Sequence, residues 1–328
     1  MIDLPSYGPT TRIRLGNFLR MRPLLLNYEG IEKLENFQVR CILSTRDIPF
    51  EKLRSDRQDL LFIDNSNEII PYWIEEVSDT QIKLWLRFPK IVPGTETFWL
   101  YFGNTNFSGL SNGEATFEFF DDFRDANRWI IAGSNPDKIT INETEGRIEW
   151  NGLTKKETTR AFCKIQGIGS LNNFIIEIDK MKFTSRQTYS HGYFATIANT
   201  SQTPDEQDTL LGFSAPYEFD DLNPRVKIAG EVYSPSKIKN VSWSSFRWIS
   251  IVKHADTVIY RIFADKNRTL EIPNSPKSNT DPALNGANFG DYIFAVSAYN
   301  VGQSFPHSGF FYRLKIRKYT DPQPFIVV

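Results

Sequence analysis

The chain has 328 residues, more than one small hydrophobic core needs, so its length favours two domains. Its 38 lysines and arginines balance 39 aspartates and glutamates, which excludes the basic excess by which general nucleic-acid-binding proteins displace counterions. Aromatic residues make up 14% of the chain, with 26 phenylalanines between short apolar runs, a composition typical of all-β proteins.

The chain has two cysteines, Cys41 and Cys163, in different predicted domains. We expect two buried free thiols, with a disulfide between them left open, and no disulfide-stapled secreted scaffold. No run of about 18 apolar residues predicts a transmembrane helix, and the first residues lack the pattern of a signal peptide. The chain is therefore expected to stay inside the cell, to reach a surface by another route, or to lack its signal here.

The first domain is predicted from a series of short strands. Residues 1–20 are expected to be an N-terminal arm, and residues 21–116 a small β-sandwich-like domain. Apolar runs predict strands, and one helical turn within residues 50–57 is expected before the last of them. The predicted strands are 22–27, 37–43 and 60–63.

A hairpin closes this domain. Residues 81–88 alternate, with Ile82, Leu84, Leu86 and Phe88 on one face, and residues 97–102 alternate in the same way. Pro93 and Gly94 supply the turn chemistry between the two strands. The hairpin is expected to bury its aliphatic face.

Residues 117–328 are predicted to form a second domain. Short strands recur with turn signals and no helical period between them, which favours a two-sheet sandwich of jelly-roll type. The expected strands are 139–141, 147–150, 174–181, 192–198, 209–213, 225–229, 248–253, 258–264, 292–298 and 310–317. The fold class is therefore all-β throughout.

Four motifs in order resemble a known family. They are LENFQV at residues 34–39, LFID at 61–64, IPYWIE at 70–75 and YFGN at 101–104. This run is similar to the prokaryotic domain-of-unknown-function family 2341. In that family the domain is often followed by an F-x-F-F-D-D-F segment and a concanavalin A/laminin G-like jelly roll with an R-K-Y-x-x-P-x-P tail. Residues 117–123 and 317–324 resemble both features.

The resemblance implies a surface-exposed, binding-type protein and supplies no activity. Relatives of this kind usually carry a secretion signal and further surface domains, whereas this chain shows neither. A virion component would explain surface modules without export. The resemblance also implies that Trp85, Trp99 and Tyr101 pack a sandwich face or a domain contact rather than forming a binding platform.

The sequence contains only part of a glycoside-hydrolase motif. Such jelly rolls carry E-x-D-x-x-E or E-x-D-x-E, where paired carboxylates act as nucleophile and general acid. Glu177 and Asp179 begin this pattern, but Met181 and Lys182 stand where the third carboxylate is needed. His191, His254 and His307 have no partner at zinc-ligand spacing. We expect no enzyme.

Binding residues are expected in loops of the second domain. An exposed aromatic ring can stack on a sugar while polar neighbours bind its hydroxyls. The candidates for sugar stacking are Tyr189, Tyr217, Tyr233, Trp243 and Tyr299, and the candidate calcium loop is Glu218, Asp220, Asp221 and Asn223. Calcium stays optional, because acidic loops are commonly solvated turns.

Three classes of function remain open. The first is a non-enzymatic surface or virion protein, an adhesin that binds glycans or a cell-surface partner through the jelly-roll loops. The second is a purely structural assembly subunit that contacts other copies of itself or other particle subunits. The third is a hydrolase with a non-standard site. Nucleic acid and a membrane span are not expected, and the extracellular surface or a virion is the expected location.

Overall fold

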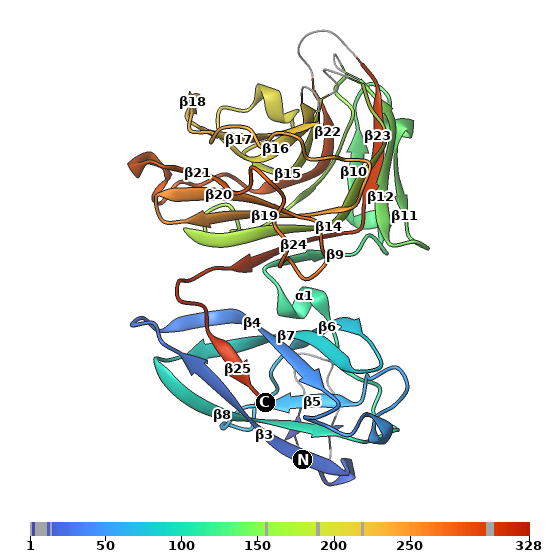
Figure 1. Cartoon of the computed structure of the whole chain (residues 1–328), viewed down its shortest axis with the longest axis vertical. Coiled ribbons are helices and arrows are strands. Elements are labelled where there is room, and N and C mark those ends of the chain that lie inside the picture. The colour runs from blue at the N-terminus through green and yellow to red at the C-terminus, as the bar shows by residue number, and fades with distance from the viewer. Residues whose placement is uncertain are drawn as a thin grey trace. The chain divides into compact units, whose positions relative to one another are not determined.

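The computed structural model describes residues 2–3, 12–13, 15–154, 157–187, 191–217, 220–299 and 305–328. Strands account for 51% of the structure and helices for 7%, which confirms the all-β prediction. The chain divides into two compact units (Figure 1), unit 1 with Met1–Phe117 and Thr320–Val328, and unit 2 with Glu118–Tyr319. In the described residues, no helix has the length and apolar character needed to cross a membrane.

Unit 1 contains a four-stranded and a three-stranded antiparallel sheet. The first has the order β25-β3-β8-β5 and the second the order β4-β7-β6. Their bounds are β3 (Arg20–Tyr28), β4 (Leu34–Ser44), β5 (Leu60–Ile63), β6 (Tyr72–Val77), β7 (Gln81–Ile91), β8 (Gly94–Phe102) and β25 (Phe325–Val327). A separate pair joins β1 (Ile2–Asp3) to β2 (Arg12–Ile13). The helical segments are η2 (Leu15–Asn17), η3 (Phe50–Lys52) and α1 (Gly113–Thr116).

The predicted hairpin builds the core of unit 1. Ile82, Leu84, Leu86 and Phe88 are all buried in it, as the alternation of β7 requires. On the other face of β7, Trp85 lies opposite Trp73 of β6, and both rings contact the edge of Phe117, at 5.7 and 5.6 Å between centroids. The tryptophans of β6 and β7 are therefore packed within unit 1.

The last residues of the chain return to unit 1. In β25, Phe325, Ile326 and Val327 pair with Asn27, Leu26 and Leu25 of β3. Residues 320–328, which the sequence analysis assigned to the second domain, thus complete a sheet of the first. The reason is backbone pairing, because the edge of β3 offers unpaired hydrogen-bonding groups that β25 satisfies.

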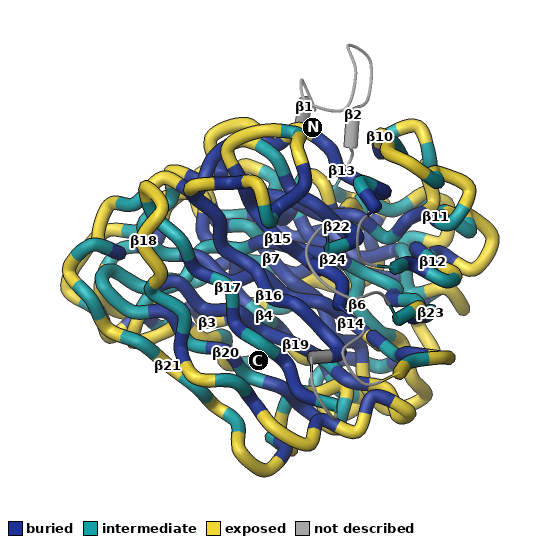
Figure 2. Tube along the Cα trace, turned by 90° about the horizontal axis from the view of Figure 1, so that it is seen from above, coloured by how far each residue is buried: buried dark blue, intermediate teal, exposed yellow. Residues whose placement is uncertain are grey.

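Unit 2 is a sandwich of a seven-stranded and a nine-stranded antiparallel sheet, with the buried residues along the strands and the exposed ones in the loops (Figure 2). The seven-stranded sheet has the order β10 (Ile130–Ala132), β13 (Arg160–Lys164), β22 (Tyr292–Ala298), β15 (Gly192–Ala198), β16 (Leu210–Tyr217), β17 (Asp221–Ile228) and β18 (Glu231–Val232).

The nine-stranded sheet is arranged around one long strand, β14 (Asn173–Ser185). Its main path is β11 (Ile139–Asn142), β12 (Arg147–Leu153), β23 (His307–Phe311), β14, β19 (Arg247–His254), β20 (Thr257–Phe263) and β21 (Lys277–Thr280). β24 (Arg313–Lys318) also pairs with β14, and β9 (Phe119–Asp121) pairs with β24. Short 3-10 turns are η4 (Ala126–Arg128), η5 (Pro136–Lys138), η6 (Pro204–Glu206) and η7 (Pro282–Leu284).

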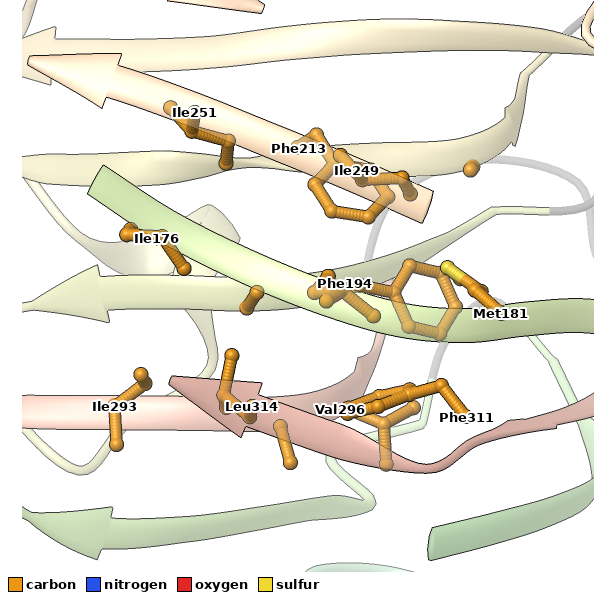
Figure 3. Packing of buried hydrophobic residues seen from close by; sticks show 14 of the residues in the cluster. Ile176, Met181, Phe194, Phe213, Ile249, Ile251, Ile293, Val296, Phe311 and Leu314 are labelled. Carbon is orange, nitrogen blue, oxygen red and sulfur yellow. The ribbon is translucent and has the colours of Figure 1, made fainter. Parts of the chain in front are cut away.

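Side chains from the facing sides of the two sheets fill one core. Ile176 and Met181 of β14 lie among Phe194, Phe213 and Val296 of the seven-stranded sheet (Figure 3). Because successive side chains of a strand point to opposite faces, the side chains that alternate with these core residues must point outward.

Most expected strands are present, and three match the predicted bounds, 60–63, 192–198 and 292–298. Residues 310–317 were predicted as one strand but form β23 and β24. The break lies beside an irregularity of β14 between Ile178 and Met181, where Lys180 has a φ of 52°. The two halves of the segment pair with β14 on either side of that irregularity.

Candidate functional site

Several strand ends of the seven-stranded sheet meet at one place. Gly192, the first residue of β15, lies opposite both Ala215 of β16 and Ala298 of β22. Tyr217 pairs with Asp221 where β16 passes into β17. The segments before β15, between β16 and β17, and after β22 therefore lie at the same end of the sheet.

Three predicted sugar-stacking residues belong to these segments, namely Tyr189, Tyr217 and Tyr299. Tyr189 lies outside the described residues, and the structure describes only the backbone of Tyr217. Tyr299 directly follows β22 and is half-buried. The pairing of Gly192 with Ala298 thus brings together strand ends that are more than 100 positions apart in the sequence.

A row of polar side chains crosses the outward face of the same sheet. Directly paired residues point to the same face, and five of them in succession carry hydrogen-bonding groups, namely Arg160, Ser297, Tyr193, Ser214 and Asn223. Their neighbours in the strands, including Phe194 and Phe213, belong to the core and fix the outward direction of the row.

Aromatic rings and a guanidinium group gather around Tyr193, the middle member of this row. The rings of Tyr193 and Tyr299 stack with centroids 5.4 Å apart and planes inclined by 22°, and the ring of His191 lies 5.2 Å from that of Tyr299. Arg225 Cζ is 5.8 and 5.7 Å from the two tyrosine ring centroids. We call His191, Tyr193, Arg225 and Tyr299 the tyrosine cluster.

The cluster is held in place by its surroundings. Arg225 donates from Nε to Ser214 Oγ at 3.0 Å, which fixes the guanidinium group beside the two rings. Tyr193 is only 4% exposed, and burial raises the pKa of its phenol above the ordinary value, so the hydroxyl stays neutral at physiological pH. A neutral phenol can both donate and accept a hydrogen bond.

Two other predicted residues lie elsewhere. Trp243 is fully buried, and its ring contacts the edge of Phe183 at 5.3 Å in the core of unit 2. Its expected role in stacking on a sugar is therefore corrected, because no face of its ring is open to a ligand. Tyr233 is half-buried and packs against the same core.

The predicted calcium loop has its carboxylates engaged by cations. Asp220 forms a two-pronged ion pair with Arg186, with one contact of 2.7 Å from Nη2 to Oδ2. Asp221 lies 3.4 Å from Lys237 Nζ and accepts from the backbone N–H of Asn240 at 3.2 Å. Asn223 belongs to the polar row, and Glu218 lies outside the described residues. As they stand, Asp220 and Asp221 do not fit a calcium ion, which needs free oxygen ligands.

Glu177 and Asp179 form an ion network on the outward face of the nine-stranded sheet. Glu177 lies 3.2 Å from Lys315 and 3.4 Å from Arg317, and Asp179 lies 2.6 Å from Arg268 and 3.0 Å from Arg313. Burial alone would raise both pKa values, but these cations outweigh it. They hold the pKa of Glu177 at about 2 and that of Asp179 below its usual range. Carboxylates that stay ionised cannot donate the proton that a glycosidase acid must supply.

His307 is buried in the core of unit 2. Its Nδ1 accepts from Trp150 Nε1 at 2.9 Å, and burial lowers the pKa of the imidazole to about 4. A Cβ at Gly192 would lie 2.7 Å from Cε1 of this ring, so a glycine is required there. Among the described residues, no group of three or more His, Cys, Asp or Glu side chains is arranged to hold a metal ion.

Residues 56–132 match the model of a family described as "Domain of unknown function (DUF2341)", which confirms the predicted resemblance. The match begins in unit 1, contains the motifs at 61–64, 70–75 and 101–104, and ends at β10 in unit 2. The motif at 34–39 precedes it. A search of curated proteins finds no match to the sequence of the chain.

Three solved structures illustrate what the fold is similar to. A mutant of the GH43 protein BlXynB from Bacillus licheniformis has 10% identity and a TM-score of 0.46, and the alignment covers 81% of this chain and 56% of that one. The VIP36 exoplasmic/lumenal domain, in its Ca2+/Man2-bound form, has 9% identity and a TM-score of 0.42, covering 63% and 90%. Arcelin-5, a lectin-like defense protein from Phaseolus vulgaris, has 9% identity and a TM-score of 0.40, covering 61% and 97%.

Proposed function

We propose that this protein is a non-enzymatic glycan-binding protein and that the tyrosine cluster is the centre of its binding site. The observation that carries the proposal is the half-buried ring of Tyr299, stacked on Tyr193 with Arg225 beside both rings. A ring supported from behind offers a rigid face to the C–H groups of a sugar and loses little entropy on binding.

The polar row supplies the groups that would bind sugar hydroxyls. Asn223 of β17 is half-buried and can present its amide to a sugar hydroxyl, whereas Ser214 of β16 is buried and accepts a hydrogen bond from Arg225. Three of the five members of the row, Ser297, Ser214 and Asn223, are uncharged hydroxyl or amide groups, and Tyr193 is a neutral phenol. This chemistry favours a glycan rich in hydroxyls over a strongly charged ligand.

Under this proposal the protein is not a hydrolase, and it acts at a cell or particle surface. The paired carboxylates Glu177 and Asp179 are neutralised by four cations, which suits a structural role. A glycan exposed on a cell surface would be the natural partner, and adhesion the natural consequence.

A pair of matched variants tests the proposal. The full-length chain is applied to an array of neutral glycans, and the strongest ligand is then titrated against Tyr299→Ala and Tyr292→Ala. Both variants remove a tyrosine ring near β22, at its two opposite ends. We expect Tyr299→Ala to weaken binding about tenfold or more, and Tyr292→Ala to bind like the wild type.

Three outcomes would contradict the proposal. If no neutral glycan on the array binds and the chain is found assembled in particles or filaments, the structural-subunit alternative would be favoured. Equal losses in the two variants would show that the ring of Tyr299 has no particular role. Hydrolysis of a bound polysaccharide that ceases in Glu177→Gln would restore the enzyme hypothesis.

A further inference from the structure

A second group of aromatic side chains lies on the outward face of the nine-stranded sheet. Phe246 lies 6.4 Å from Trp248 and 6.1 Å from Phe310, and Phe310 lies 5.8 Å from Tyr312, measured between ring centroids. Phe246 is 37% exposed and the other three rings are half-buried. The four rings form a continuous line at the surface of unit 2, which we call the aromatic strip.

Three cations lie over the rings of the strip. Arg147 Cζ is 4.5 Å from the centroid of Phe310, Lys180 Nζ is 5.0 Å from that of Tyr312, and Lys182 Nζ is 5.6 Å from that of Phe246. Contacts of this kind at solvent-accessible sites are weak. The cations can therefore exchange a ring for a better partner without a large cost.

The two lysines have no competing acid. In the described part of the chain, neither Lys180 nor Lys182 forms an ion pair with a carboxylate, whereas Arg147 pairs with Glu149 at 2.8 Å. Strand register explains why these groups meet, because Phe310 lies opposite both Glu149 of β12 and Lys182 of β14. The strip and its cations thus carry three positive charges against one negative charge.

We propose that the aromatic strip binds an acidic polysaccharide, one that carries carboxylate or sulfate groups. The lysine ammonium groups would pair with the anionic substituents, while the ring edges and faces would contact the C–H groups of the sugars. A chain ligand suits the strip because its rings follow one another along the surface rather than enclosing a pocket.

A single-stranded nucleic acid has the same charge but fits less well. Successive bases stack on rings that offer their faces in series. In the strip, Phe310 and Tyr312 are inclined by 81° and Phe246 and Phe310 by 69°, so neighbouring rings do not form such a series. The balanced charge of the whole chain also lacks the basic excess of a general nucleic-acid-binding protein.

This inference does not depend on the tyrosine cluster, which lies on the other sheet and is built from other residues.

The test uses the full-length chain and two probes, a polygalacturonate oligosaccharide and a sulfated heparin-type oligosaccharide, with an uncharged glucan of equal length as reference. Binding is measured at fixed ionic strength with Lys182→Gln, Phe246→Ala and Tyr299→Ala. Lys239→Gln is the control, because Lys239 is an exposed lysine of unit 2 that is not one of the three cations over the rings.

We expect at least one acidic oligosaccharide to bind more tightly than the uncharged glucan. Lys182→Gln should weaken that binding about fivefold and Phe246→Ala about tenfold, whereas Lys239→Gln and Tyr299→Ala should leave it unchanged. Retained acidic binding in Tyr299→Ala separates this inference from the proposed function.

Three results would overturn the inference. Equal losses from Lys182→Gln and Lys239→Gln would mean a diffuse electrostatic effect without a site. An unchanged affinity in Phe246→Ala would remove the aromatic strip from the interaction. Tighter binding of a single-stranded oligonucleotide than of either acidic glycan, lost in the same variants, would assign the strip to nucleic acid.

Discussion

The two sheets of unit 2 carry their outward polar groups in different ways. On the seven-stranded sheet, a row that includes hydroxyl, phenol and amide groups has at its middle Tyr193, whose ring is inclined by 22° to that of Tyr299. On the nine-stranded sheet, carboxylates are locked between cations, and the exposed rings stand at steep angles to one another. The first face gathers mostly uncharged polar groups beside a stacked pair of rings, and the second uses its charges to hold strands together. The comparison shows why a pair of carboxylates alone is a poor guide to a site.

Replacement of Glu177 should have the largest effect, because it removes the close carboxylate of Lys315, which is 0% exposed. We expect Glu177→Gln to lower the free energy of unfolding of unit 2 by about 3–5 kcal/mol. Chemical denaturation measures it, with Glu149→Gln as control. The partly exposed pair of Glu149 with Arg147 should contribute less than about 1 kcal/mol. A small effect at Glu177 would mean that this ion network is dispensable.

Acid should weaken unit 2 through His307. Its folded pKa of about 4 lies below the ordinary value of 6.5, so the unfolded chain takes up the proton first. The contribution of the neutral ring is complete above pH 6.5 and is lost as the pH falls towards 4, to a total of about 3 kcal/mol.

The check is the pH dependence of unfolding in the wild type and in His307→Gln, whose amide oxygen can still accept from Trp150. Because other titrating groups are common to both proteins, the difference between the two curves isolates the imidazole. Parallel curves between pH 4 and 6.5 would contradict the buried neutral state.

Substitution of Trp243 should change the stability of the protein, whereas substitution of Tyr299 should change its affinity for a glycan. Trp243→Phe leaves a space in the core and should lower stability by about 2 kcal/mol while the affinity for a neutral glycan stays the same. Tyr299→Ala should show the reverse pattern. A loss of affinity in Trp243→Phe, in protein that remains folded, would return Trp243 to the list of binding residues.

The smallest effect is expected at Asp220. Because its pair with Arg186 is partly exposed, Asp220→Asn should cost less than about 1 kcal/mol. Calcium added to the wild type should leave the melting temperature unchanged. A rise in melting temperature with calcium that Asp220→Asn abolishes would show that the ion displaces Arg186.

Much of the fold follows from local pattern. The alternation of Ile82, Leu84 and Leu86 placed one face of β7 in the core, because a strand sends successive side chains to opposite sides. The prediction for Trp243, which follows β18, was wrong because this residue is not part of such a pattern. Residues near Trp243 form no regular strand, yet they cross the end of the core and fill it.

The residues of the candidate site are brought together by the register of strand pairing, which could not be predicted from the sequence. Tyr193 and Arg225 read as ordinary strand residues, and only the pairing of β15 with β16 and β22 brings them beside Tyr299. The return of β25 to unit 1 was equally hidden, because three residues carry too little pattern to identify a partner strand. Long-range pairing decided both.

A crystal structure of the full-length chain with its strongest neutral oligosaccharide tests the central claim most directly. The account predicts a sugar ring against the face of Tyr299, with hydroxyl groups within hydrogen-bonding distance of Arg225 or Asn223. A sugar bound elsewhere, such as along the aromatic strip, with the tyrosine cluster free of ligand, would contradict it.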